Sequence, residues 1–370
     1  MLKIAPRDHD GEWNPNGLCF TDHEEWKRSG MGFNFVPAGY INAGGSSGES
    51  KNKNVRETRA EFTGKALQSK ILERLPTSKE QLFLSKDIRE HEYFKSLAWD
   101  SKIRQEIVDN AWRAAYNEWY TYSLKERLIK HAAKKWDSYE LHVQYYSPEY
   151  SCLLLSYLLY KQCGDEDICI QFIDNLIAVA DRKVPKKNTF YIFGPHSCGK
   201  GFFIDSFLLI LWSLGLMGNF DRYCQFPFQD ATYPFRAALK YNEPCITSNI
   251  EDVLKLLEGD PFRVNIKHIG PQMLPRTPVF MMSNRHPWRF MPEREGAMMD
   301  RMFMYTWTAQ PFLRNCQKKP TPHAWILLLE KYKDPAWWAE VAAYDDCDFN
   351  DFDIVESDDE PSMYDLYCTE

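Results

Sequence analysis

Apolar residues recur at four-residue intervals through much of the first half of the chain, a period that predicts α-helices. Between residues 57 and 135 the spaced sets are Leu67, Ile71 and Leu75, then Ile103, Ile107 and Ala111, then Tyr120, Leu124 and Leu128. Another apolar face runs from Ile168 to Ala180. Residues 1–56 have no such period and hold several glycines, so we expect irregular structure there.

The pattern changes near residue 189, where short apolar runs begin to alternate with polar or helical stretches. The runs lie at 189–193 (TFYIF), 237–241 (AALKY), 277–284 (TPVFMMSN) and 298–307 (MMDRMFMYTW). Their length and their β-branched and aromatic content are typical of buried strands. Alternating strands and helices predict an α/β domain with a central parallel sheet, preceded by an α-helical domain.

The first apolar run leads into GPHSCGKG at 194–201, which an apolar helical segment follows. Strand, GxxxxGK and helix is the order in which a phosphate-binding loop occurs. Glycines let backbone N–H groups converge on the phosphates, and the helix presents its positive N-terminal end. We therefore predict a nucleotide-binding loop made of Gly194, Pro195, His196, Ser197, Cys198, Gly199, Lys200 and Gly201.

One usual element of such a loop is missing. The residue after the lysine is normally Ser or Thr, whose hydroxyl ligates Mg²⁺, and here it is Gly201. Asn242 and Glu243 follow the next apolar run. A carboxylate in that place can hold the metal or orient the attacking water, whereas Asn242 offers only a neutral carbonyl oxygen. We predict that both residues lie at the Mg²⁺ site.

Other polar residues mark the remaining strands. Asn284 ends its run, where it can hydrogen-bond a γ-phosphate or a water, although asparagine is also common where strands turn. Lys267 and His268 lie between two extended stretches, as at the tip of a hairpin. Arg301 stands at the head of the last run.

Taken in order, these residues resemble the helicase domain of superfamily 3, and within it the large non-structural replication protein of parvoviruses, with the densoviruses nearest. The resemblance covers residues 154–307 and rests on KKNTFYIFGPHSCGKGFF, YNEP, the KH of NIKHIG, PVFMMSN and DRMFMYTW. It implies an AAA+-type P-loop domain that uses ATP and Mg²⁺. It also implies a hexameric helicase that unwinds forked and single-stranded viral DNA, 3′ to 5′, in the host cell nucleus.

The resemblance further implies a role for each nucleotide-site residue. Gly194, Gly199 and Lys200 would form the Walker A loop. Glu243 would be the Walker B acid that orients water, and Asn284 would sense the γ-phosphate.

Two more roles depend on a ring of subunits. Arg301 would be the arginine finger that completes the site of the adjacent subunit. Lys267 and His268 would lie on a hairpin that grips single-stranded DNA in the central channel.

Gly201 and Asn242 both weaken metal binding, and they motivate a second hypothesis from another class. The chain would then be a nucleotide- and DNA-binding regulator or transactivator with weak or no hydrolysis. A third hypothesis, a P-loop ATPase that is not a helicase, would require the KH and Arg301 matches to be accidental. The resemblance also implies an N-terminal nicking nuclease with a His-x-His metal pair and a catalytic Tyr. No such pair occurs among the nine histidines, so we expect that the nuclease is absent and that the chain is a fragment, a shorter product or a divergent member.

These patterns and the resemblance together divide the chain into segments. We predict an irregular N-terminal segment at 1–56, a helical domain at 57–150, a helical oligomerisation block at 151–185, the helicase and ATPase domain at 186–310, a C-terminal helical segment at 311–344 and a disordered acidic tail at 345–370.

Net charge taken over the whole chain argues against a nucleic-acid partner, because the 370 residues carry a net charge of −7. The tail, however, holds 11 of the 52 acidic residues and none of the 45 basic ones, which leaves +4 on the preceding 344 residues. Basic residues gather at 125–135, near several aromatics, as either a DNA-facing surface or a solvated helix face. The tail alternates acidic and hydrophobic residues, as an activation segment for host transcription factors or as a solubilising or autoinhibitory tail.

No apolar run approaches the roughly 18 residues of a membrane span, and the first residues lack the apolar core of a signal peptide. The ten cysteines include no CxxC pair. We expect a reduced intracellular protein with buried thiols and no membrane partner.

Overall fold

The computed structural model describes residues 2–4, 18–20, 64–76, 79–84, 102–132, 143–231 and 235–349. Two short strands, β1 (Leu2–Ile4) and β2 (Leu18–Phe20), pair antiparallel within the segment where no regular structure was expected. The acidic tail beyond residue 349, with its predicted disorder and its partners, lies outside the described residues. So do Lys134 and Lys135 of the basic stretch.

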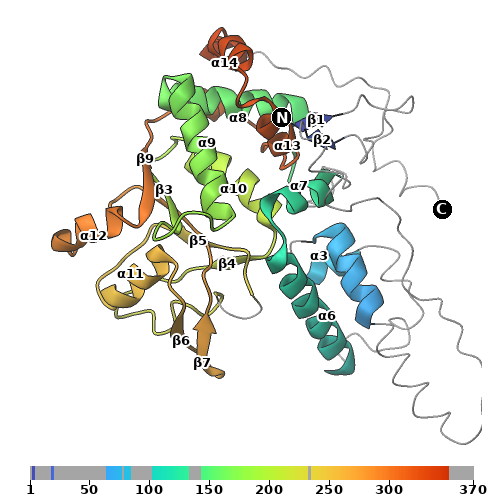
Figure 1. The fold of residues 1–370 in the computed structure, drawn as a ribbon, viewed down its shortest axis with the longest axis vertical. Coiled ribbons are helices and arrows are strands. Elements are labelled where there is room, and N and C mark those ends of the chain that lie inside the picture. Colours follow the sequence, from blue (N-terminus) through green and yellow to red (C-terminus); the bar gives the residue numbers. More distant parts are fainter. Residues whose placement is uncertain are drawn as a thin grey trace, which may run out of the picture.

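A five-stranded parallel sheet forms the centre of the molecule, in the order β4-β5-β8-β3-β9 (Figure 1). The strands are β3 (Thr189–Phe193), β4 (Leu214–Leu216), β5 (Ala238–Asn242), β8 (Val279–Ser283) and β9 (Met302–Thr306). All four apolar runs expected to be strands are strands of this sheet, so the predicted α/β class is confirmed. In a parallel sheet the carboxyl ends of all strands meet at one edge, which brings the segments after β3, β5 and β8 together.

Helices cover one face of this sheet. They are α8 (Pro148–Cys163), α9 (Glu166–Ala180), α10 (Lys200–Leu211), α13 (Ala324–Lys331) and α14 (Pro335–Ala342). Alternate residues of β3 show the division, because Phe190 and Ile192 join the core under these helices while Tyr191 joins the core on the opposite face. Burying both faces explains why the strands are mostly apolar, with Lys240 of β5 as an exception.

The opposite face is covered by α11 (Ile250–Glu258) and by a hairpin of β6 (Phe262–Ile266) and β7 (Gly270–Leu274). Short helices flank β9: η3 (Pro292–Arg294), α12 (Glu295–Met299) and η4 (Pro311–Asn315). The hairpin forms as predicted.

The N-terminal helices pack directly against the end of α10 (Figure 1). They are a helix at 64–74, α3 (Lys79–Leu84), α6 (Lys102–Thr121) and α7 (Leu124–Ala132). The indole of Trp119 donates to the Leu211 carbonyl at 2.7 Å, and that of Trp212 donates to the Pro76 carbonyl at 2.8 Å. Two buried indoles that are also hydrogen-bonded tie the helical region to the α/β domain.

This packing corrects one expectation about the basic and aromatic stretch. Trp119 is 0% exposed and Arg127 is 1% exposed, so neither can form part of a DNA-facing surface. Burial lowers the pKa of Arg127 to about 9. Both interpretations of this stretch, a DNA-facing surface and a solvated helix face, place its residues on helices. The packing of those helices determines which side chains face the core.

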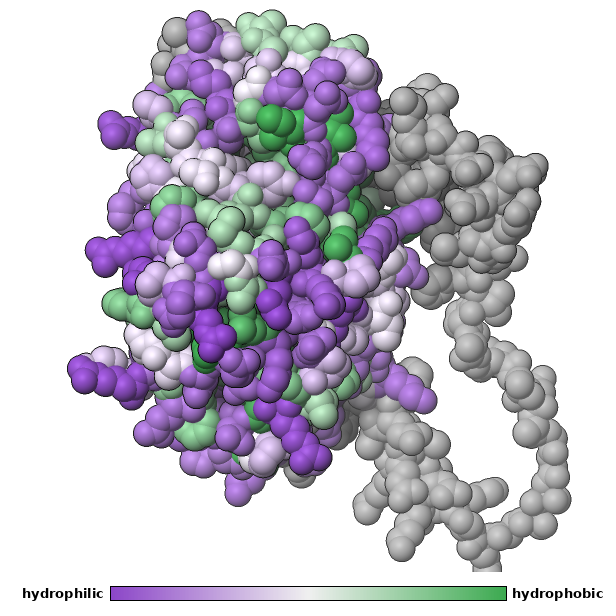
Figure 2. Space-filling view, turned by 60° about the vertical axis from the view of Figure 1, so that its left-hand side comes forward, coloured by the Kyte–Doolittle hydropathy of each residue, from purple (hydrophilic) through white to green (hydrophobic). Residues whose placement is uncertain are grey.

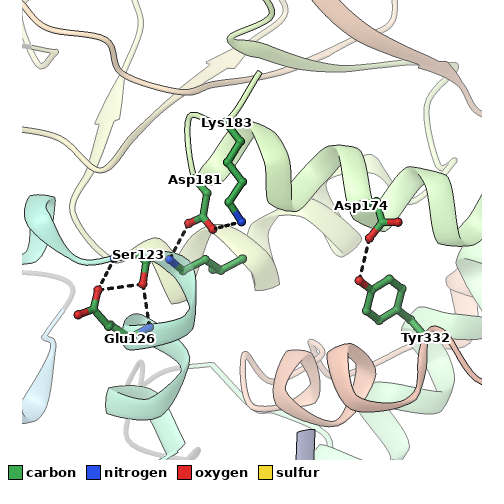
Figure 3. Close-up of polar contacts among 7 residues, drawn as sticks. Ser123, Glu126, Asp174, Asp181, Lys183 and Tyr332 are labelled. Carbon is green, nitrogen blue, oxygen red and sulfur yellow. Dashed lines mark hydrogen bonds and ion pairs between the residues drawn. The ribbon is translucent and has the colours of Figure 1, made fainter. Parts of the chain in front are cut away.

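Polar contacts hold α7 and α13 onto α9 (Figure 3). The backbone N–H of Leu124 donates to the carboxylate of Asp181 at 2.7 Å, and Asp181 also pairs with Lys183 at 3.0 Å. On the other side, the Tyr332 hydroxyl donates to Asp174 at 2.8 Å. Asp174 and Asp181 therefore fix two neighbouring helices from one face of α9.

The C-terminal helices dock on α8, as expected from their apolar runs. Trp325 and Trp338 are 0% and 1% exposed, and α13 and α14 both contact α8. The chain ends its described part in η5 (Asp346–Phe349), where Phe349 is buried against Tyr157 and Phe312.

Hydrophobic side chains on the visible surface form separate patches among hydrophilic ones (Figure 2). Of the helices in the described ranges, none combines the length and the apolar character needed to cross a membrane.

Candidate nucleotide and DNA site

The phosphate-binding loop lies at the carboxyl end of β3, as its sequence order predicts. Gly199 has a φ of +89° and Ser197 a φ of +59°, both in the left-handed region that lets successive N–H groups turn inward. A Cβ on Gly194 would lie 2.6 Å from the carbonyl oxygen of Trp307, so only glycine fits there. Gly199 begins α10 without a side-chain cap, which leaves the first N–H groups of the helix available to an anion.

Lys200 bends back over this loop. Its Nζ donates to the carbonyl oxygens of Gly194 at 2.7 Å and Pro195 at 2.8 Å, and to Oδ1 of Asn284 at 2.8 Å. Sγ of Cys198 also lies 3.3 Å from Nζ, so four acceptors share the three donors of the ammonium. Phosphate oxygens that enter the loop would replace some of these acceptors, so the lysine is held where a phosphate would lie.

Glu243 and Asn284 meet beside the lysine, because they follow the neighbouring strands β5 and β8. The backbone N–H of Asn284 lies 3.1 Å from both carboxylate oxygens of Glu243. Glu243 has a φ of +45°, an uncommon conformation for a residue other than glycine. Below them, burial raises the pKa of Tyr191 to about 12, so its hydroxyl stays protonated near Ser283.

A cavity of about 450 Å³ opens over these groups. It is lined by His196, Ser197, Cys198, Gly199, Lys200, Gly201, Phe202, Glu243, Asn284, Leu313 and Arg314. The side-chain amide nitrogen of Asn284 lies 3.2 Å from Nδ1 of His196. Six of the eight predicted loop residues thus share one cavity with Glu243 and Asn284. Gly194 and Pro195 do not line the cavity.

Sequence reasoning missed one wall of the cavity. Leu313 and Arg314 come from η4, outside every motif, and Leu313 packs against Gly199. Gln162 of α8 supports the same loop, because its amide nitrogen donates to the Cys198 carbonyl at 3.0 Å. No local sequence signal marks these residues, since they reach the loop only through tertiary packing.

The donor set fits a nucleotide-bound Mg²⁺ in part. Glu243 supplies a carboxylate at the cavity, while Asn242 ends β5 as an exposed amide and Gly201 has no donor. Within the described residues, His, Cys, Asp and Glu side chains form no group of three or more that could hold a metal by themselves. Phosphate oxygens and waters would therefore supply most ligands, as is usual for Mg²⁺.

Lys267 and His268 lie at the turn between β6 and β7, both exposed. The backbone N–H of Lys267 donates to the side-chain oxygen of Gln229 at 2.9 Å, which joins the turn to the preceding loop. On that loop, Tyr223 is 78% exposed and the guanidinium of Arg222 lies over its ring. This exposed aromatic and cationic pair was not predicted from the sequence.

Arg301 lies away from the phosphate loop of its own chain. Arg301 immediately precedes β9, and the first residue of β9 pairs with the first residue of β3. Arg301 is therefore at the amino edge of the sheet, whereas the phosphate loop follows β3 at the carboxyl edge. Its Nε pairs with Glu258 at 2.9 Å, and its Nη1 donates to the Ala297 carbonyl at 2.6 Å. Within one chain Arg301 does not join the nucleotide site.

The chain was compared with families of known proteins. Residues 170–288 match the model of the family described as Parvovirus non-structural protein NS1. The resemblance of the chain to the parvovirus NS1 family is confirmed. The matched region begins in α9 and includes the phosphate loop, Glu243, the hairpin and Asn284, so it supplies every residue of the cavity wall except Leu313 and Arg314.

Individual relatives agree with the family match. Initiator protein NS1 of Junonia coenia densovirus and of Diatraea saccharalis densovirus are each 38% identical over 193 residues, which are 51% of this chain and 34% of each relative. The match thus spans about a third of those NS1 proteins. A solved structure of JCV Helicase aligns with 81% of this chain and 94% of that chain, at a TM-score of 0.49 and 14% identity; at that level nothing follows about activity.

Proposed function

We propose that this chain is the ATP-driven DNA helicase part of a parvovirus-type replication initiator. The observation that carries the proposal is the convergence of Lys200, Glu243 and Asn284 on one cavity at the phosphate loop. The name of the NS1 relatives, initiator protein, supports a role in starting viral DNA replication. Arg301 lies at the sheet edge opposite the phosphate loop of its own chain, so the proposal requires a ring in which it reaches the site of the adjacent subunit.

In this proposal each residue has a part in hydrolysis. Lys200 neutralises charge on the β- and γ-phosphates, and the N–H groups of the loop hold their oxygens. When bound near Glu243, Mg²⁺ would offset negative charge on the phosphates. Glu243 accepts a hydrogen bond from the attacking water and orients it, while Asn284 contacts the γ-phosphate. Arg301 reaches the site of the adjacent subunit and stabilises charge in the transition state.

Strand separation tests the proposal. The chain, ATP and Mg²⁺ should release the labelled strand of a forked duplex, with a preference for a 3′ single-stranded tail on the strand along which it moves. ATP hydrolysis stimulated by single-stranded DNA without any strand release would contradict the helicase assignment and favour an ATPase of another kind. We place this activity in the host nucleus, where a viral DNA template would be replicated.

The hairpin turn is the proposed DNA contact. Lys267→Ala is expected to weaken single-stranded DNA binding by about 10-fold at low salt and to reduce the dependence of affinity on salt concentration, because a lysine that neutralises a phosphate releases a counterion. Fluorescence anisotropy with a labelled oligonucleotide at several salt concentrations measures both. Lys333→Ala is the matched control, since Lys333 is an exposed lysine that pairs with Asp174. Equal losses in both variants would argue against a hairpin contact.

A second function is favoured by Gly201 and Asn242, which offer neither the hydroxyl nor the carboxylate expected near the metal. In this alternative the chain binds nucleotide and DNA as a regulator and hydrolyses ATP slowly or not at all. Tight ATP binding without Mg²⁺-dependent phosphate release would select it.

A further inference from the structure

The missing side chain at Gly201 leaves open space at the start of α10. A Cβ built on Gly201 meets one neighbouring atom within 4 Å, which is Oδ2 of Asp205 at 3.7 Å. Residues four apart lie on the same face of a helix, and helical side chains lean toward the N-terminus. Asp205 therefore directs a carboxylate oxygen to the place that a Ser or Thr hydroxyl would approach.

The two oxygens of Asp205 have different surroundings. Oδ1 pairs with Nζ of Lys240 at 2.5 Å. For Oδ2, no hydrogen bond or ion pair occurs within the described residues. The Asp205 side chain is 44% exposed, so water and ions can reach this oxygen. Lys240 thus fixes the carboxylate through one oxygen and leaves the other directed toward Gly201.

Strand β5 adds a second group on the same side. Lys240 and Asn242 are two residues apart and so lie on one face of the strand. That face is the one covered by α10, because Lys240 contacts Asp205 of that helix. Asn242 therefore lies on the face of β5 that is covered by α10, the helix that carries Gly201 and Asp205.

We propose that Asp205 is a metal-site residue that replaces the carboxylate missing at Asn242 and the hydroxyl missing at Gly201. Its Oδ2 accepts a hydrogen bond from a water of nucleotide-bound Mg²⁺, which keeps several waters in most protein sites. The gap left by Gly201 holds that water. This inference rests on the proposed nucleotide site and adds a residue that lies outside the usual motifs.

Metal binding to the purified full chain tests the proposal. Calorimetry gives the affinity for ADP with Mg²⁺ and with EDTA, and electron paramagnetic resonance gives the Mn²⁺ bound with ADP. Asp205→Asn should leave ADP affinity in EDTA unchanged and lower Mn²⁺ affinity in the ADP complex by about 10-fold or more. Asp252→Asn is the control, since Asp252 is an exposed carboxylate paired with Lys255 on α11.

A second variant changes metal affinity in the opposite direction. Lys240→Gln frees Oδ1 and removes a competing cation, so it should raise Mn²⁺ affinity, whereas a purely structural ion pair predicts no rise. Gly201→Ser should restore metal binding to the Asp205→Asn variant, because the serine supplies the missing hydroxyl in open space.

Unchanged Mn²⁺ affinity in both Asp205→Asn and Lys240→Gln would overturn the role of Asp205. Failure of the unsubstituted chain to bind ADP would instead overturn the proposed function, so the two failures are distinguishable.

Discussion

Lys200→Ala is expected to abolish ATP hydrolysis, with a loss of at least about 10²–10³-fold in the rate. The lysine is the cation held at the centre of the phosphate loop, and its acceptors are two loop carbonyls, Sγ of Cys198 and Oδ1 of Asn284. Water can replace the ammonium at these acceptors, so the fold should remain intact. Phosphate release with saturating single-stranded DNA measures the effect.

The matched control for Lys200→Ala is Lys255→Ala, which removes an exposed lysine from α11. It should hydrolyse ATP at the rate of the unsubstituted chain, and the two variants should melt at similar temperatures. If the Lys200→Ala variant retained DNA-stimulated ATP hydrolysis, the phosphate loop would not be the site of hydrolysis.

Arg301→Ala is expected to lower hydrolysis by about 10³-fold or more, as loss of an arginine finger does, while ADP binding is retained. Arg301 is at the sheet edge opposite the phosphate loop and pairs with Glu258, so its removal leaves its own chain's nucleotide cavity unchanged. The expected split between binding and turnover is measured by calorimetry and phosphate release on the same preparation.

Mixing two inactive variants tests whether Arg301 acts between subunits. Lys200→Ala retains the arginine and Arg301→Ala retains the loop, so mixed rings contain interfaces with both groups intact. Random assembly at equal amounts should restore about a quarter of the interfaces and a comparable share of the activity. A mixture as inactive as its components would contradict action in trans.

Much of the nucleotide site could be predicted because its signals are local. A buried strand followed by GxxxxGK and a helix specifies the loop within a short stretch of chain. The sites of Glu243 and Asn284 followed from two more apolar runs, since carboxyl ends of parallel strands share an edge. The hairpin turn at Lys267 was equally local, and the structure has it where the sequence placed it.

The residues that sequence reasoning missed depend on contacts distant along the chain. Arg314 reaches the cavity from η4, and Gln162 supports the phosphate loop from α8. Helical periodicity likewise predicted α6 and α7 but not that Trp119 and Arg127 face the core. The spacing of apolar residues identifies one face of a helix, but the tertiary packing determines whether that face contacts the core or solvent.

ATP hydrolysis at the phosphate loop is the step on which the proposed helicase activity depends. The most direct measurement is phosphate release by the unsubstituted chain with ATP and single-stranded DNA, with and without Mg²⁺. The account predicts DNA-stimulated turnover that requires Mg²⁺. Tight ATP binding with no Mg²⁺-dependent release of phosphate would contradict it.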